Sequence, residues 1–359
     1  MSTGAIAGGV VGAVAGFVVA GPYGMAAGMM LGMAVGMMID PIDTGAIAKP
    51  DMTDLSAPTA AEDKPIADLC GTTMVANAAN FLFYANNWTK EIKAESGGKG
   101  GGQEYTEGYH YYLTFGLGIG MGPIYALYSI NEDNQLIWSA GDTPLTIDDA
   151  VNGHVTLTIY NRGTIDFYFG TPDQPASPAM TAAIGYELPY PGLCYAVFND
   201  FMIGTYNRAG SFKFCIKKYP DDAGTGVAAI AEYDANPALA LRYILVEKLR
   251  ISTDRIDEAG FAAAAQVLSD EERGISGLFT GESPAIDYME IILFHIRGCL
   301  YTTAEGKISI RLYRRDMSPE DMITIDETDI LEEISVSRKN MSELENQVNG
   351  TYTKITEDE

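Results

Sequence analysis

Basic residues are scarce in this sequence of 359 residues. Only 23 Lys and Arg stand against 48 Asp and Glu, which leaves a formal charge of −25 at pH 7. Proteins that bind the phosphate backbone need clustered Lys and Arg side chains. We therefore expect no sequence-specific nucleic acid binding. The plainest interpretation of the charge is an acidic surface that keeps the protein soluble.

Cysteine and histidine are scarce as well. The four cysteines and three histidines are dispersed, no Cys-x-x-Cys pair occurs, and no spacing suits a metal site. We expect no cofactor, no metal and no disulfide framework, as for a chain made in a reducing cytoplasm. A cysteine inside an apolar string, such as Cys194 in LCY, is typical of a small core residue.

Catalytic motifs are also lacking. The run SGGKGGG at 96–102 looks like a phosphate-binding loop, but no Ser or Thr follows its lysine and no helical pattern follows the run. We interpret it as a loop tip. Acidic pairs such as Glu271-Glu272 and Glu332-Glu333 are typical of solvated surfaces, and no nucleophile or His–carboxylate pattern accompanies them. The sequence therefore predicts that the protein is not an enzyme.

The N-terminal segment, residues 4–39, has no charged side chain. It is too long for a secretory signal and lacks the basic residues that begin one, because the first Lys or Arg is Lys49. Glycine recurs at every fourth position in two runs, which are joined by the turn-like Gly-Pro-Tyr-Gly at 21–24. This spacing puts each run on one stripe of a helix, so two helices can pack closely through their glycines. The residues of the two stripes are Gly4, Gly8, Gly12, Gly16, Gly24, Gly28, Gly32 and Gly36.

The sequence thus predicts an apolar helical hairpin over residues 1–40. Each arm has roughly 13–17 residues, or about 20–25 Å as a helix, which is short of the ~20 residues that span a bilayer. Glycine destabilises a helix in water by about 1 kcal/mol per residue, so the hairpin needs apolar surroundings. Three surroundings remain open: the host membrane, the same segment of other copies, or the lumen of an assembly. A low-complexity tail without an ordered role is the alternative.

The body of the chain shows strands first, then helices, then strands. Residues 41–64 are typical of an extended linker. Alternating apolar residues predict strands over 105–117, 155–159 and 212–216, and a hairpin over 126–138 that turns at 132–134. Such an order indicates an α+β fold and argues against a doubly wound parallel sheet.

Three helices are predicted between these groups of strands. Asn236-Pro237 supplies a cap and a first-turn proline, the second helix begins near Asp257, and the third runs from Pro284 to about Arg297. In the second helix one face carries Phe261, Ala264, Ala265 and Leu268. A last hairpin over 299–315 turns at 304–306.

Three stretches in the middle of the chain contain longer motifs: FYFGTPDQPASP at 167–178, PYPGLCYAVF at 189–198 and YNRAGSFKF at 206–214. In this order they resemble segments of the tail-tip hub, or host-specificity, family of long-tailed bacteriophages. The family patterns are Y/F-x-G-T-x-D-Q-x-x-x-P, Y-R-G-x-A/C-Y-V-V-F and G-N-R-x-P-x-F-x-F. Matching residues are Gly170, Asp173, Gln174, Tyr190, Gly192, Tyr195, Phe198, Asn207 and Arg208, and further on Arg315 and Asp316.

The sequence departs from these patterns at three places. Pro191 stands where the family has arginine, Tyr206 where it has glycine, and Gly210 where it has proline. The collinear resemblance covers residues 60–355. Family members continue well past the segment that matches 346–353, so we expect either a split member, which a second chain completes, or a minimal hub.

The resemblance implies a fold, a location in the virion and binding partners. The fold would be a mixed β-barrel hub: a first β-rich domain at 65–222, a helical insert at 223–300, and a hairpin with the start of a second β domain at 301–359. The protein would be made in the host cytoplasm and lie in the virion, at the tail tip. It would form a homotrimeric ring that closes the tail tube and joins it to distal receptor-binding parts.

The implied partners are the chain itself, tail tube or distal tail proteins, and the tape measure protein. The alternative function is a membrane-inserting protein, in which residues 4–39 contact the host membrane and form a pore for DNA passage.

Overall fold

The computed structural model describes residues 7, 10–11, 13–15, 28–33, 35, 65–76, 80–95, 104–206, 208–280 and 283–314. The chain divides into two compact units, Met1–Leu312 and Tyr313–Glu359. All of the elements below belong to the first unit. The domain limits given above stay predictions.

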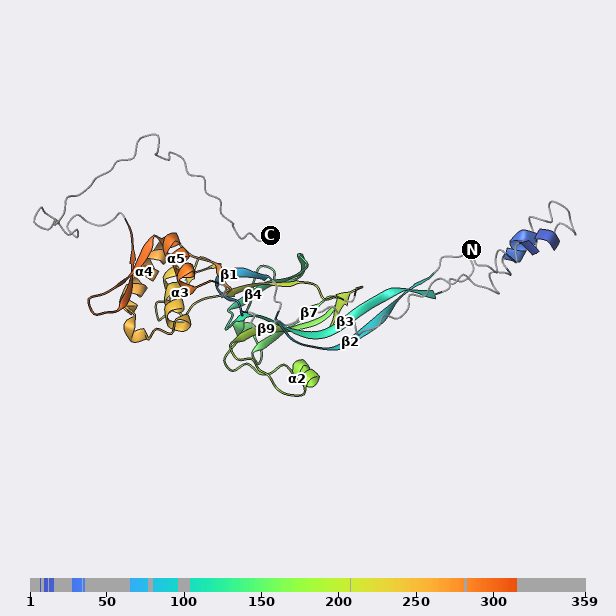
Figure 1. The fold of residues 1–359 in the computed structure, drawn as a ribbon, viewed down its shortest axis with the longest axis horizontal. Helices are drawn as coiled ribbons and strands as arrows, with labels where there is room; N and C mark the ends of the chain where they lie inside the picture. The colour runs from blue at the N-terminus through green and yellow to red at the C-terminus, as the bar shows by residue number, and fades with distance from the viewer. Residues whose placement is uncertain are drawn as a thin grey trace, which may run out of the picture. The chain divides into compact units, whose positions relative to one another are not determined.

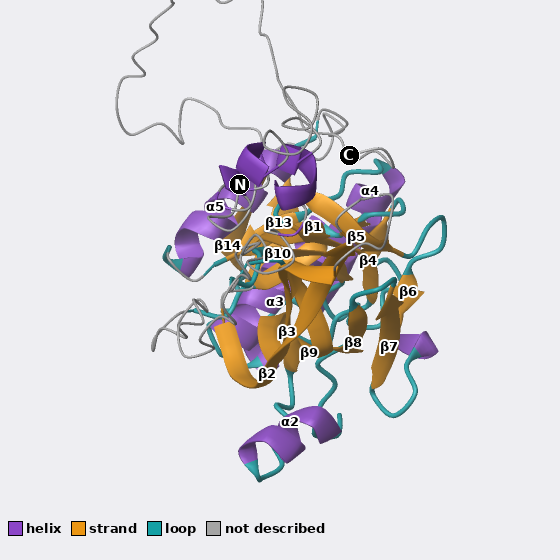
Figure 2. Ribbon diagram, turned by 90° about the vertical axis from the view of Figure 1, so that its right-hand side faces the viewer, coloured by secondary structure: helices purple, strands orange, loops and turns teal. Residues whose placement is uncertain are grey.

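Two antiparallel sheets form the larger part of this unit (Figures 1 and 2). One sheet has five strands, in the order β2 (Asn80–Glu95), β3 (Glu104–Met121), β9 (Leu193–Gly204), β8 (Gly163–Tyr168) and β7 (His154–Ile159). The other has the order β13 (Gly277–Phe279), β1 (Asp68–Ala76), β10 (Phe212–Lys218), β4 (Ala126–Glu132) and β5 (Gln135–Ser139), and β6 (Leu145–Thr146) also pairs with β4.

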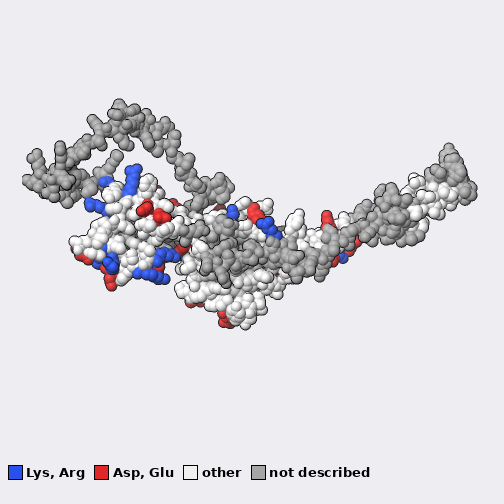
Figure 3. Space-filling model, in the orientation of Figure 1, with Lys and Arg blue, Asp and Glu red and all other residues white. Residues whose placement is uncertain are grey.

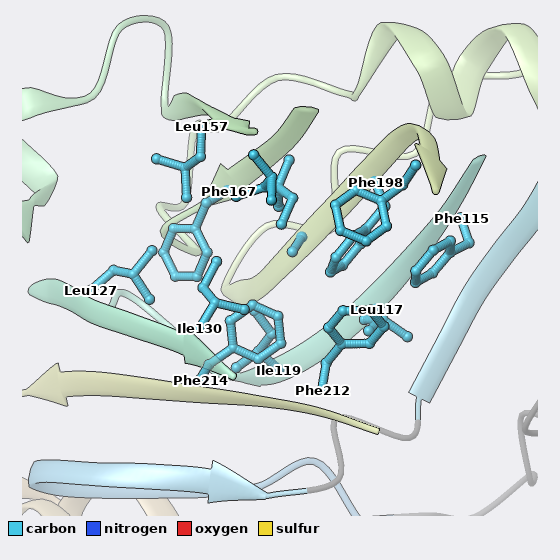
Figure 4. Packing of buried hydrophobic residues seen from close by; sticks show 14 of the residues in the cluster. Phe115, Leu117, Ile119, Leu127, Ile130, Leu157, Phe167, Phe198, Phe212 and Phe214 are labelled. Atoms are coloured by element: carbon cyan, nitrogen blue, oxygen red, sulfur yellow. The ribbon is translucent and has the colours of Figure 1, made fainter. Parts of the chain in front are cut away.

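The sheets pack face to face around an apolar core (Figure 4). Phe115, Phe198, Phe212 and Phe214 lie at its centre, and the rings of Phe115 and Phe198 stack 4.4 Å apart. Because side chains of a strand point alternately to its two faces, the five predicted inward residues of β3 enter this core together. These residues are Tyr109, Tyr111, Leu113, Phe115 and Leu117.

A helical part packs against one end of the sheet that contains β1 and β10, around Cys70 (Figure 1). It consists of α3 (Pro237–Tyr243), a π-helical turn η3 (Ile244–Lys248), α4 (Glu258–Asp270) and α5 (Ala285–Ile296), followed by the hairpin β14 (Gly298–Thr302) and β15 (Ile308–Leu312). Strand β1 joins the two cores, because Leu69 enters the core between the sheets and the next residue, Cys70, enters the helical core. The short pair β11 (Ala229–Ile230) and β12 (Asp234–Ala235) and the turn η4 (Thr253–Arg255) complete this part.

Most of the predicted local elements are confirmed. The hairpin of β4 and β5 turns at Asp133 and Asn134, both with positive φ. Asn236 caps α3 and accepts a hydrogen bond from the backbone N–H of Ala238. Helix α4 buries the predicted apolar face in full, and the last hairpin turns at 303–307.

The mixed α+β class is confirmed, whereas the predicted closed barrel is wrong for the strands that the structure describes. Each sheet ends in strands that pair on one side only: β2 and β7 in one, β13 and β5 in the other. The sheets bury their apolar faces against one another and stay open at the sides. Alternation in the sequence predicts two-faced strands, but a sandwich and a barrel need the same alternation.

The predicted glycine hairpin lies largely outside the described residues. Gly28 and Gly32 are helical and half-buried, while Met30 and Leu31 between them are 71% and 69% exposed. Gly4, Gly8, Gly12, Gly16, Gly24 and Gly36 lie outside the described residues. Within the described part of the chain, no helix has both the length and the apolar character needed to cross a membrane.

Candidate functional site

The motif residues of 167–178 and 189–198 meet at the side chain of Gln174, which is only 3% exposed. Its Oε1 accepts a hydrogen bond from the backbone N–H of Gly170, at 2.9 Å. Its Nε2 faces three backbone carbonyls, those of Pro189, Tyr190 and Leu193, at 2.7–3.0 Å. One amide side chain therefore ties together both ends of the long connection between β8 and β9.

The backbones of two glycines, Gly170 and Gly122, lie in close contact next to this amide. Gly170 follows β8 with φ of 82°, and a Cβ atom built on it would lie 2.7 Å from Cα of Gly122 and 2.9 Å from the backbone nitrogen of Cys194. Only glycine fits such a close backbone approach at positive φ. The backbone N–H of Gly122 donates to the carbonyl of Gly192 at 2.8 Å. Gly192 itself has a φ of 79°, so the backbone conformation favours glycine in the second motif as well.

A row of aromatic rings crosses the outer face of the same sheet. His154, Tyr168 and Tyr195 are cross-strand neighbours on β7, β8 and β9, so their rings stack in sequence at 4.9 Å and 4.3 Å. Tyr190 meets Tyr195 edge-on at 5.9 Å. Burial raises the pKa of both Tyr168 and Tyr195, which keeps their phenols neutral.

Helix α2 (Pro178–Ile184) covers this aromatic row. Ser177 caps the helix and is fully buried, Pro178 occupies the first turn, and Gly185 ends it in the left-handed conformation. Met180 packs with Phe83, Tyr168 and Tyr195 in a small separate core. The connection from β8 to β9 is therefore a folded cover held at both ends.

A hollow of about 520 Å³ lies beside this cover. Asp173 lines it together with Thr171, Tyr168 and His154. The described residues contain no group of three or more His, Cys, Asp or Glu placed to hold a metal ion. The lining of the hollow offers both hydrogen-bonding groups and apolar side chains, which suits the binding of a ligand.

The remaining predicted residues are dispersed. Phe198 is fully buried in the core between the sheets, and Arg208 is exposed, with its backbone N–H donating to the carbonyl of Tyr206. Asn207, Arg315 and Asp316 lie outside the described residues. The structure thus brings together Gly170, Asp173, Gln174, Tyr190, Gly192 and Tyr195 but not the other motif residues.

Sequence reasoning missed a buried ionic cluster where the sheet meets the helical part. Lys218 Nζ donates to Asp68 Oδ1 at 2.6 Å and to the carbonyl of Met121 at 3.0 Å, and the Tyr243 hydroxyl donates to Asp68 Oδ2 at 2.6 Å. Lys248 also pairs with Asp68. Burial pushes the pKa of Asp68 upward, but the charge and hydrogen bond of Lys218, helped by Lys248 and Tyr243, outweigh burial and leave this pKa lowered.

The neighbouring Lys217 is buried on the same strand, among tyrosines. Its Nζ donates to the carbonyl of Glu232 at 2.7 Å and lies 5.1–5.9 Å from four ring centroids. Burial lowers the pKa of this lysine, and the nearby Glu232 opposes the shift. The one signal in the sequence was a pair of lysines inside an apolar strand, FKFCIKKY. The rings belong to Tyr125, Tyr128, Tyr219 and Tyr233.

No protein-family model matches this sequence, and no curated protein matches it. The structure is similar to a chain of a solved structure described as "Virion of native gene transfer agent (GTA) particle", with a TM-score of 0.43 and 16% sequence identity. The similarity covers 70% of the present chain and 53% of that chain. The chain therefore spans about half the length of the virion chain that it matches.

Proposed function

We propose that this chain is a structural component of a phage tail tip, where three copies form the hub that closes the tail tube and joins it to distal receptor-binding parts. We also propose that it has no catalytic activity of its own. The partners would be other copies of the chain, tail tube or distal tail proteins, and the tape measure protein.

The observation that carries this proposal is the convergence of two family motifs on Gln174. Gly170 from the first motif and Tyr190 and Leu193 from the second are joined through the Gln174 amide, which holds the backbone of the two segments together. A motif that serves packing and backbone hydrogen bonding supports a structural function, because catalytic motifs instead present nucleophiles, acids or bases to a substrate.

The test is to purify virions of a phage that encodes this chain and to identify their proteins by mass spectrometry. We expect the chain at low copy number, and antibody labelling in electron microscopy should mark the end of the tail. Absence from the virion would overturn the proposal. Labelling along the tube or on the capsid would overturn the tail-tip position but leave a structural role.

Membrane insertion of the N-terminal segment is the second candidate function. Its described helical residues expose large apolar side chains to solvent; Val11, for example, is 70% exposed and Met30 is 71% exposed. Helices of this kind need apolar surroundings, whether lipid or protein.

A liposome leakage assay with the full chain tests this candidate. We expect Gly28→Leu and Gly32→Leu to abolish leakage, because a bulky side chain on the stripe keeps the helices apart. Met30→Leu is the matched control, since it leaves the stripe unchanged. An absence of leakage by the unmodified chain would exclude the candidate.

A further inference from the structure

Strand β7 is one edge of the five-stranded sheet. Its inner neighbour is β8, and no described strand pairs with its other side. On that side the backbone of His154 already bonds to Val151, so the free stretch begins after His154 and includes Thr156 and Thr158. An edge strand presents unpaired backbone N–H and C=O groups, to which another strand can add. The side chains of β7 alternate in the required way: Leu157 and Ile159 are buried in the core, while Thr156 and Thr158 are exposed.

A hollow of about 570 Å³ runs beside this edge, at the open side of the sandwich. Leu145 of β6 lines it from the other sheet, and Val155 and Leu157 line it from β7. Val151, also in the lining, is 70% exposed. An added strand could therefore place apolar side chains into the hollow from one of its faces.

The surroundings of this edge are acidic. Between residues 100 and 207 the chain carries eleven Asp or Glu and a single Lys or Arg, Arg162. That arginine is already engaged, because it pairs with Glu132 and donates to the carbonyl of Met202. Figure 3 shows that most of the visible Lys and Arg side chains lie over the helical part instead. Asp149 lines the hollow, Asp148 precedes it in the same turn, and Asp142 lies three residues before Leu145. Asp166 accepts a hydrogen bond from the hydroxyl of Thr156 on β7.

This acidic charge indicates which kind of partner can bind at the edge. A second copy would bring the same acidic sheet and the same net charge of −25, and like charges across an interface are costly. A segment with Lys or Arg gains attraction instead, and a nucleic acid is repelled. We propose that the free edge of β7 and the hollow beside it bind an extended, Lys- or Arg-bearing segment of another protein, which adds to the sheet as a sixth strand. The site rests on the sheet edge and its charges and does not depend on the tail-tip role.

The probe is a displayed library of random ten-residue peptides, selected against the full chain at low salt. Enriched peptides should alternate apolar residues with Lys or Arg. Hydrogen exchange with one synthesised peptide should show new protection of the outward backbone amides of β7, those of Thr156 and Thr158. Enrichment of acidic or non-alternating peptides, protection elsewhere, or no enrichment at all would overturn the proposal.

Charge reversal tests the same site without disturbing the core. Asp142 and Asp148 are exposed on the turns that flank β6, so the double change Asp142→Lys/Asp148→Lys should fold normally. We expect it to weaken peptide binding about tenfold at low salt, and less at high salt because ions screen the charges. Asp254→Lys, on an exposed turn of the helical part, is the control and should bind as the parent does.

Self-association is the competing outcome. If β7 served a second copy, light scattering would show oligomers that the double charge change alters and that unlabelled peptide dissociates. That result would overturn the proposal, even if the tail-tip function held. Absence of the chain from virions would overturn the tail-tip function and leave the peptide-binding result intact.

Discussion

Removal of the Gln174 side chain is the sharpest test of how the long connection between β8 and β9 is held. In Gln174→Ala, the N–H of Gly170 and the carbonyl of Leu193 lose their partner in a buried position. The carbonyls of Pro189 and Tyr190 are closer to the surface, so water can replace the lost hydrogen bonds there.

The expected loss of stability follows from the two buried groups. Each unsatisfied buried donor or acceptor costs about 1–3 kcal/mol, so together they predict a loss of roughly 2–6 kcal/mol in the free energy of unfolding. Urea unfolding, followed by tryptophan fluorescence, measures that loss. Native-state hydrogen exchange should show the fastest new exchange at residues 170–193, since the cover opens before the sheets separate.

Two further variants make the test specific. Gln135→Ala, on the exposed edge strand β5, should change stability by no more than about 0.5 kcal/mol. Gln174→Glu keeps the acceptor for Gly170 but directs a carboxylate at three carbonyls. Its loss of stability relative to the parent should be larger at pH 7 than at pH 4, where the protonated acid can donate. A Gln174→Ala variant with the stability of the parent would mean that this amide does not hold the connection between β8 and β9.

Three other predictions concern packing, charge and reactivity. Gly170→Ala should destabilise far more than Gly185→Ala: both residues have positive φ, but only at Gly170 does the new Cβ meet backbone atoms, and urea unfolding of the pair measures the difference. The pKa of Asp68 is lowered in the folded state, so its contribution is present above about pH 4, the ordinary range of an aspartate, and is lost as pH falls through the lowered folded-state value. In Asp68→Asn that acid dependence should shrink, and stability at pH 7 should fall by about 3–5 kcal/mol because Lys218 stays buried without its partner. Burial raises the pKa of the Cys194 thiol well above its usual value, so iodoacetamide at pH 8 should label it only after unfolding, as mass spectrometry of the peptides would show.

The local elements could be predicted because their causes are local. The periodicity of β3, the Asn236 cap and proline of α3, and the apolar face of α4 all lie within a few neighbouring residues. Strand β2 was missed because its 16 residues include the polar run NNWTKEIK, and only pairing with β3 makes that run a strand. Propensity alone does not identify such a strand, since cross-strand partners supply its stability.

Part of the candidate site could also be read from the sequence, as motifs. Gly170, Gln174, Tyr190 and Gly192 were singled out one after another along the chain, yet nothing local indicates that a single amide joins them. The ionic cluster of Asp68 could not be predicted from the sequence at all. Its partners lie 150 and 175 residues away along the chain, and a buried charge differs from an exposed one only through what surrounds it.

Composition and short-range spacing were enough to predict the α+β class, the starts of α3, α4 and α5, the acidic charge and the two glycine stripes. Helix α2 was not predicted. Three features became evident only in the folded chain: the sheets stay open as a sandwich, β1 contributes to two cores, and β7 is a free edge in acidic surroundings. The physical reason is that burial and pairing are properties of distant contacts. A strand with the same alternating pattern can be an edge strand, a central strand or a strand of a closed barrel, and its neighbours decide which of these it becomes.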